Sequence, residues 1–150
     1  MFSHYVKLAC AALLAAIAAM PLPADAAPLI TAEEAALPPQ KGAVPNSGRG
    51  ITRGPKIQAP AESGAQASPM RFQVKFQPYH GSSIDLDALK VTYLKSPVVD
   101  LTPRIKPFAQ ASGIDMPDAQ LPPGEHLVRI DVKDSDGRPA SVSFVLKIAP

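Results

Sequence analysis

Strict alternation of side chains along the last part of the chain constrains the fold more than any other feature. From residue 126 to residue 148 every second residue suits a buried face, and only Asp-Ser-Asp-Gly at 134–137 interrupts the pattern. A period of two is typical of a half-buried β-strand, and this tetrapeptide is typical of a turn. The sequence therefore predicts a hairpin whose inward side chains are His126, Val128, Ile130, Val132, Ala140, Val142, Phe144, Leu146 and Ile148.

The same alternation predicts further strands earlier in the chain. The first covers residues 70–77, with Met70, Phe72, Val74 and Phe76 on its inner face. After a turn at 79–83, apolar residues recur at 84–86, 89–94 and 98–101, and then at Ile114, Met116 and Leu121. The last group indicates an edge strand, where a proline such as Pro117 is tolerated.

Residues 103–113 fit a strand least well. Thr102-Pro103 is typical of a helix start, but Pro107 removes a backbone donor four residues later, so at most one distorted turn is expected. We expect Phe108 to be its buried side chain. Further on, Pro122-Pro123-Gly124 has the order of a type II turn before the final hairpin.

About six or seven short strands, with a turn roughly every ten residues, predict an all-β fold, a two-sheet antiparallel sandwich over residues 70–150. The stretch 84–93 (IDLDALKVTY), followed by 121–134 (LPPGEHLVRIDVKD) and Gly137, resembles bacterial immunoglobulin-like domains. The chain departs from the antibody type, because it holds one cysteine and no tryptophan. The resemblance implies a generic sandwich with a binding or spacing role and assigns no site residue.

Residues 27–69 have a different composition. They contain seven prolines and many Ala, Gly and Ser residues, with few β-branched and no aromatic side chains, so we expect an extended or disordered leader. Two segments interrupt it. Residues 31–37 predict a helical turn capped by Thr31 and stopped by Pro38. Residues 48–57 hold basic groups among glycines and are interpreted as a solvated linker, with a docking strand as the alternative.

The first 26 residues have the pattern of an export signal. An uncharged apolar run over 8–20 follows Lys7 and precedes Ala24-Asp25-Ala26, and it is shorter than the ~20 residues that span a membrane. Cleavage after Ala26 is favoured, because cleavage after Ala27 puts Pro28 behind the scissile bond. Lipidation at Cys10 is the alternative. We therefore expect a periplasmic or secreted protein without stable membrane insertion after cleavage.

Composition excludes several classes of function. Processing removes one base and one acid, so the formal net charge stays at +2, and basic residues form no stripe with aromatics; no nucleic-acid partner is expected. Cleavage of the export signal also removes Cys10, the sole cysteine. No Gly-x-Ser-x-Gly elbow or phosphate-binding glycine loop occurs, and His80 beside Ser82 and Ser83 is typical of a turn, so an enzyme and a bound cofactor are not expected.

Two groups of residues raise the alternative of a periplasmic metal-binding protein. Asp131, Asp134, Asp136 and Gly137 are similar in type to a calcium loop, but in its register Val132 and Ser143 take the first and last ligand positions. His80, His126, Met70 and Met116 are the candidate copper ligands. Met70 and His126 also belong to predicted core faces.

The function that the sequence favours is a non-catalytic accessory or protein-interaction module of the bacterial cell envelope. Rigid strands present edges and loops to a partner. The segment 97–123 is the expected contact surface, because it is long for a connection and rich in proline. Its candidate contact residues are Arg104, Lys106 and Phe108.

Overall fold

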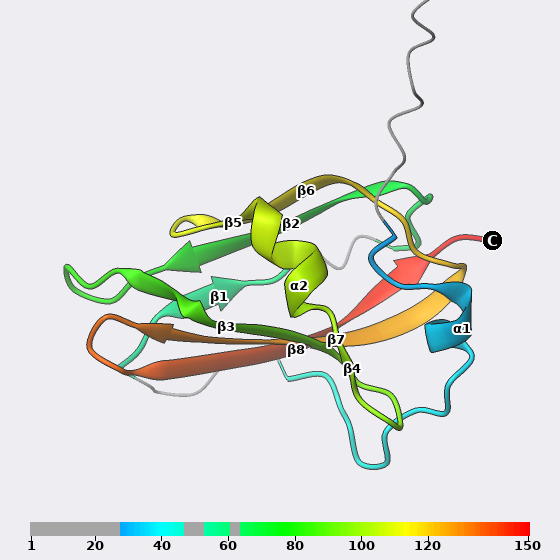
Figure 1. Ribbon diagram of the computed structural model, residues 1–150, viewed down its shortest axis with the longest axis horizontal. Coiled ribbons are helices and arrows are strands. Elements are labelled where there is room, and N and C mark those ends of the chain that lie inside the picture. The colour runs from blue at the N-terminus through cyan, green and yellow to red at the C-terminus, as the bar shows by residue number, and fades with distance from the viewer. Residues whose placement is uncertain (1–27, 47–52, 61–63) are drawn as a thin grey trace, which may run out of the picture.

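The computed structural model describes residues 28–46, 53–60 and 64–150 (Figure 1). The predicted export signal, with Cys10, lies outside these residues, as does the part of the 48–57 segment before residue 53. In the described part of the chain, no helix is both long and apolar enough to cross a membrane.

Two four-stranded sheets form the two layers of the molecule (Figure 1). The first has the order β1-β2-β6-β5, and the second has the order β4-β3-β7-β8. All strand pairings within the sheets are antiparallel. The strands are β1 (Lys56–Gln58), β2 (Met70–Gln77), β3 (Ile84–Tyr93), β4 (Val99–Asp100), β5 (Ala109–Gln110), β6 (Gly113–Ala119), β7 (Gly124–Asp134) and β8 (Pro139–Ile148). The predicted all-β, two-sheet antiparallel architecture is confirmed.

The core lies between the sheets and follows the predicted alternation. Every second residue of β2 is buried, and the β7–β8 hairpin pairs without interruption from Gly124↔Ile148 to Lys133↔Pro139. The rings of Phe72 and Phe144, one from each sheet, stack with centroids 6.2 Å apart. Burial of one apolar face from each sheet is therefore what holds the layers together.

Three local expectations need correction. Residues 84–93 form one strand rather than two, and β3 shifts its register against β7 between Asp85 and Lys90. The short helices α2 (Thr102–Ile105) and η1 (Lys106–Phe108) bury Ile105 completely, whereas Phe108 is only partly buried. The Thr102 hydroxyl is not a helix cap, because it bonds the backbone of Val91 instead.

Strand β6 is central rather than an edge strand. It pairs with β2 along its length, and with the two-residue β5 only at Gly113 and Ile114. Pro117 lies beyond β5 and within the register shift against β2, where the ladder is interrupted. A proline is tolerated there for the reason that the sequence suggested, namely that no ladder bond needs its missing N–H.

The leader begins as part of the core, not as a free segment. Leu29 and Ile30 are buried among the residues of the sandwich, and the Leu29 amide donates to Gln120 O at 2.9 Å. Helix α1 (Ala32–Ala35) follows, with Thr31 and Glu34 forming the reciprocal bonds of a capping box, which confirms the predicted cap. The expectation that residues 27–69 form an extended or disordered leader is therefore wrong for Leu29, Ile30 and α1.

After α1 the chain crosses the outer face of the second sheet. We call residues 38–46 the strap. It is held at one end where the Ser96 amide donates to Pro38 O, and at the other where Asn46 and Ser143 exchange two backbone bonds of 2.8 and 2.9 Å. In Figure 1 the strap is the cyan segment that runs from α1 past the sheet containing β8.

The leader then reaches the edges of both sheets. Strand β1 pairs with β2, so the docking-strand alternative for this segment is correct at Lys56–Gln58 and the solvated-linker interpretation is wrong there. Further along, the Gln66 amide donates to Lys147 O, and the Ala149 amide donates to Gln66 O. These contacts cover parts of two sheet edges, which are otherwise prone to unwanted pairing.

Candidate functional site

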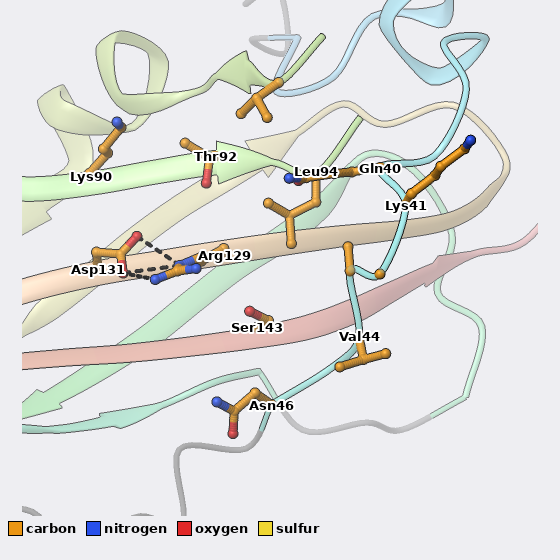
Figure 2. A pocket seen from close by; sticks show the side chains of 13 residues that line it. Gln40, Lys41, Val44, Asn46, Lys90, Thr92, Leu94, Arg129, Asp131 and Ser143 are labelled. Carbon is orange, nitrogen blue, oxygen red and sulfur yellow. Dashed lines mark hydrogen bonds and ion pairs between the residues drawn. The ribbon is translucent and has the colours of Figure 1, made fainter. Parts of the chain in front are cut away.

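An open groove of about 580 Å³ lies between the strap and the outer face of β3, β7 and β8 (Figure 2). The sheet contributes its base and the leader contributes one wall. Its lining consists of Gln40, Lys41, Gly42, Ala43, Val44, Asn46, Lys90, Thr92, Leu94, Val98, Arg129, Asp131 and Ser143. The volume is within the range of small-molecule and short-peptide sites.

The pleat of the sheet explains which residues form the base. The inward positions of β3 and β7 belong to the core, so the residues between them face the groove. Register then brings Lys90 opposite Asp131 and Thr92 opposite Arg129, while Arg129 lies opposite Ser143. Five polar side chains from three strands thus share one surface.

Exposed apolar side chains gather at this groove. Val44, on the strap, is 66% exposed, and Val98, just before β4, is 49% exposed. In the described part of the chain these are the two large hydrophobic residues that are exposed, and both line the groove. Leu94 also lines the groove and is half-buried (Figure 2). Apolar surface collected at a polar-rimmed groove is typical of a binding site.

The groove carries an excess of positive charge. Arg129 and Asp131 neutralise each other through an ion pair of 3.0 Å (Figure 2). Lys41 and Lys90 make no ion pair with any residue that the structure describes. Hydrogen bonds from Thr102, with a smaller contribution from the charge of Lys90, hold the pKa of Asp100 below its ordinary value. The lysine field therefore favours an anionic group.

The sequence identified only part of this groove. Arg129 and Asp131 lie between the predicted inward residues of the hairpin, so the period of two placed them correctly on its outward face. Lys90 and Thr92 alternate in the same way with the apolar residues of 89–94. Val98 belongs to the expected contact segment 97–123. The strap residues were missed, because a contact between residue 46 and residue 143 leaves no local signal in the sequence.

The three predicted contact residues have different surroundings. The Arg104 guanidinium forms a two-pronged ion pair with Glu34 at 2.6 and 2.8 Å and donates to Leu29 O at 2.9 Å. Hydrogen bonding from Arg104 is the main cause of the lowered pKa of Glu34. Lys106 is exposed, and Phe108 packs partly against the core. Arg104 thus fastens the leader to α2.

We expect Arg104→Ala to lower the free energy of unfolding by about 1 kcal/mol, since the pair is bidentate but partly exposed and screened by solvent. Lys106→Ala, two residues away and exposed, is the matched control and should change stability by less than ~0.5 kcal/mol. Urea denaturation of both variants checks this. Equal stability of the two variants would show that the Arg104 bonds do not fasten the leader.

The residues considered for calcium do not form a single cluster. Asp131 faces the groove, whereas Asp134 is on the buried side of β7. The Asp134 carboxylate accepts bonds from the Arg138 side chain at 2.7 Å and from the amides of Asp136 and Arg138 at 3.1 and 2.9 Å. Desolvation alone raises the pKa of Asp134, but the bonds and charge of Arg138 outweigh it and lower that pKa. Asp134 therefore organises the hairpin turn.

The candidate copper ligands are also separated. His80 lies in the turn before β3, and His126 lies near the other end of that strand, beside Tyr93. The ten residues of β3 put its two ends nine steps apart, or about 30 Å at ~3.3 Å per residue. Met70 and Met116 are buried in the core. Among the described residues, no three His, Cys, Asp or Glu side chains are grouped closely enough to hold a metal ion.

His126 uses both ring nitrogens inside the protein. Nε2 donates to Pro122 O at 2.7 Å, because a carbonyl can only accept, and Nδ1 then accepts from the Tyr93 hydroxyl at 2.9 Å. Burial raises the pKa of Tyr93 to about 12, so its hydroxyl remains a donor. Burial, with a smaller contribution from the charge of Lys95, lowers the pKa of His126 against the opposing effect of the Pro122 bond.

This burial predicts a loss of stability as pH falls below 6.5. The unfolded chain binds a proton at His126 near its ordinary pKa of 6.5, while the folded chain holds the ring neutral to lower pH. The contribution of the neutral ring to the free energy of unfolding is therefore complete above pH 6.5. Below pH 6.5 it falls by at most ~1.4 kcal/mol per pH unit. Carboxyl groups such as Glu34, whose ordinary pKa is 4.5, act only at lower pH.

Urea denaturation at pH 5 to 7.5 measures this slope. His126→Gln keeps a donor for Pro122 O and an acceptor for Tyr93 but does not titrate, so its slope should be flatter than that of the native chain. The same slope in both proteins would mean that His126 is not the group responsible.

Comparison of the chain with family models, with curated proteins and with solved structures finds no match, so the function has to be inferred from the groove and from the sequence.

Proposed function

We propose that this chain is an exported, non-catalytic protein-interaction module of the bacterial cell envelope, built on an immunoglobulin-like sandwich. We further propose that it binds its partner in the groove under the strap. The export pattern at residues 1–26 supports the location, and the two antiparallel sheets support a rigid scaffold of this type. Rigid strands that present a groove are suited to binding.

The observation that carries the proposal is the coincidence of apolar exposure and unpaired charge. Val44 and Val98 are exposed at the same groove in which Lys41 and Lys90 lack an ion-pair partner among the described residues. Such side chains contribute little to the fold, because the valines bury little area and the lysines form no ion pair within the described part of the chain. A partner that covers them gains free energy both from burying the valines and from pairing with the lysines.

The sequence raised two alternatives, of which the surface around Lys106 remains in the test. The surface around Lys106 is the contact expected from the sequence, and its exposure is compatible with that role. Arg104 is less available, because Glu34 and Leu29 O occupy its donors. No observation on the described residues favours the copper or calcium alternative, because no group of candidate ligands lies close together there.

Site-directed photo-crosslinking in cells that produce the protein tests this function. A photoreactive phenylalanine analogue replaces Val98 in the groove, Lys106 on η1, or Gln73 on the exposed face of the other sheet. We expect a discrete protein adduct from position 98 and none from position 73. An adduct from position 106 alone would move the contact to the sequence-predicted surface. No adduct from either would contradict a protein-binding role.

A further inference from the structure

We propose that the groove binds an acidic, extended peptide segment of the partner, with carboxylates near Lys41 and Lys90 and an apolar side chain against Val44, Leu94 and Val98. This inference rests on the proposed protein-binding function and adds the chemistry of the partner. It is carried by charge complementarity and by the placement of the apolar residues around the lysines.

Charge selects the sign of the ligand. Arg129 and Asp131 cancel at the base, so Lys41 and Lys90 leave the groove with two positive charges that no ion pair with a described residue neutralises, and of these only the charge of Lys90 also acts on Asp100. One comes from the strap and one from β3, so they flank the groove from opposite sides (Figure 2). Charges on both sides favour a ligand whose carboxylates are separated along a chain.

The apolar residues select against a purely polar anion. Val44 and Val98 are exposed and line the groove, and Leu94 lies between the strap and the sheet (Figure 2). Covering a valine or leucine with an apolar side chain is favourable, because it removes apolar surface from water. A free phosphate or a sugar chain gains none of this, and the described lining contains no aromatic ring on which a sugar could stack.

The shape of the groove favours an extended segment. Its base is a stretch of sheet, its wall is the non-helical strap, and it is open to solvent rather than enclosed. About 580 Å³ suits a few residues of peptide and is too open to enclose a small molecule. A peptide with alternating acidic and apolar residues presents its two kinds of side chain on opposite faces of an extended chain.

Titration of the purified chain with capped (Glu-Leu)3, followed by amide chemical shifts, tests the proposal. We expect shifts at Lys90, Thr92, Arg129 and Ser143. Capped (Lys-Leu)3 should produce none of them, and capped (Glu-Ser)3 should bind several-fold more weakly. Equal binding of (Glu-Ser)3 and (Glu-Leu)3 would overturn the apolar part of the proposal.

Charge reversal locates the contact. Lys41→Glu with Lys90→Glu should weaken (Glu-Leu)3 binding about tenfold, equivalent to ~1.4 kcal/mol. Lys75→Glu with Lys133→Glu is the matched control, because both lysines are exposed outside the groove and the net charge changes equally. Equal weakening in the two double variants would reduce the effect to overall charge and overturn the proposed site.

Failure of this inference is distinguishable from failure of the proposed function. An adduct from position 98 without any (Glu-Leu)3 binding would leave a protein-binding groove with a partner of other chemistry. Tighter binding of vesicles of anionic phosphatidylglycerol, or of a heparin hexasaccharide, with shifts at the same residues would contradict a peptide ligand. If no adduct forms and (Glu-Leu)3 does not bind, both proposals are overturned.

Discussion

Leu29→Ala is expected to lower the free energy of unfolding by about 3 kcal/mol, as is typical when a completely buried leucine is truncated. Leu29 is fully buried in the core of the sandwich although it lies 41 residues before β2 begins. The substitution removes its methyl groups and leaves a cavity that the surrounding strands fill only in part. Urea denaturation measures the loss.

Val44→Ala is the matched control, since Val44 belongs to the same leader but is 66% exposed. Its effect on the free energy of unfolding should be below ~0.5 kcal/mol, as for most surface substitutions. A leader that did not pack on the sandwich would make both substitutions harmless. The difference between the two variants therefore measures how far the leader contributes to stability.

Gly113→Ala should have an effect of similar or greater size, on the order of 4 kcal/mol. Gly113 begins β6 with φ +151°, a backbone conformation that residues with a Cβ rarely adopt. A Cβ built there overlaps the carbonyl oxygen of Val74 in β2, so the backbone of one strand has to shift. The measurement is again the free energy of unfolding, or the yield of folded protein if the variant fails to fold.

Gly42→Ala separates strain from overlap. Gly42 also has a positive φ, of +75°, but nothing lies within 4 Å of the Cβ built there. Gly42→Ala should therefore lower the free energy of unfolding by only ~1–2 kcal/mol, which is the cost of placing a residue with a Cβ in the left-handed region. If Gly113→Ala costs no more than Gly42→Ala, the close approach of β6 to β2 at Val74 is wrong.

The parts of the fold that could be predicted are those that local pattern determines. The β7–β8 hairpin and the inner face of β2 follow directly from a period of two, because one side of each strand packs on the core. The α1 cap was also predictable, since Thr31 and Glu34 have the spacing of a capping box. Each of these signals lies within a few residues along the chain.

The packing of the leader could not be predicted from its composition. Prolines and small residues dominate it, and its contribution to the core rests on only a few side chains, chiefly Leu29 and Ile30. The paired backbone groups at Asn46 and Gln66 add to this. Composition averages over a segment, whereas a few buried residues and backbone bonds are enough to dock it.

The site was harder still to predict, for the same reason. Arg104 looked available for a partner because its ion pair with Glu34 joins residues 70 positions apart. Phe108 was expected to be the buried residue of its segment, but Ile105 holds that place. The groove combines leader and strand residues, so it exists only once the strap has crossed the sheet.

Amide hydrogen exchange on the intact chain is the most direct test of the claim that the leader is folded onto the sandwich. The amides of Leu29, Asn46 and Gln66 donate to Gln120 O, Ser143 O and Lys147 O, at 2.9, 2.8 and 2.8 Å. These three amides should exchange at least ~100-fold more slowly than in an unstructured peptide. Exchange at the unstructured rate for all three would contradict the packed leader, and with it the groove.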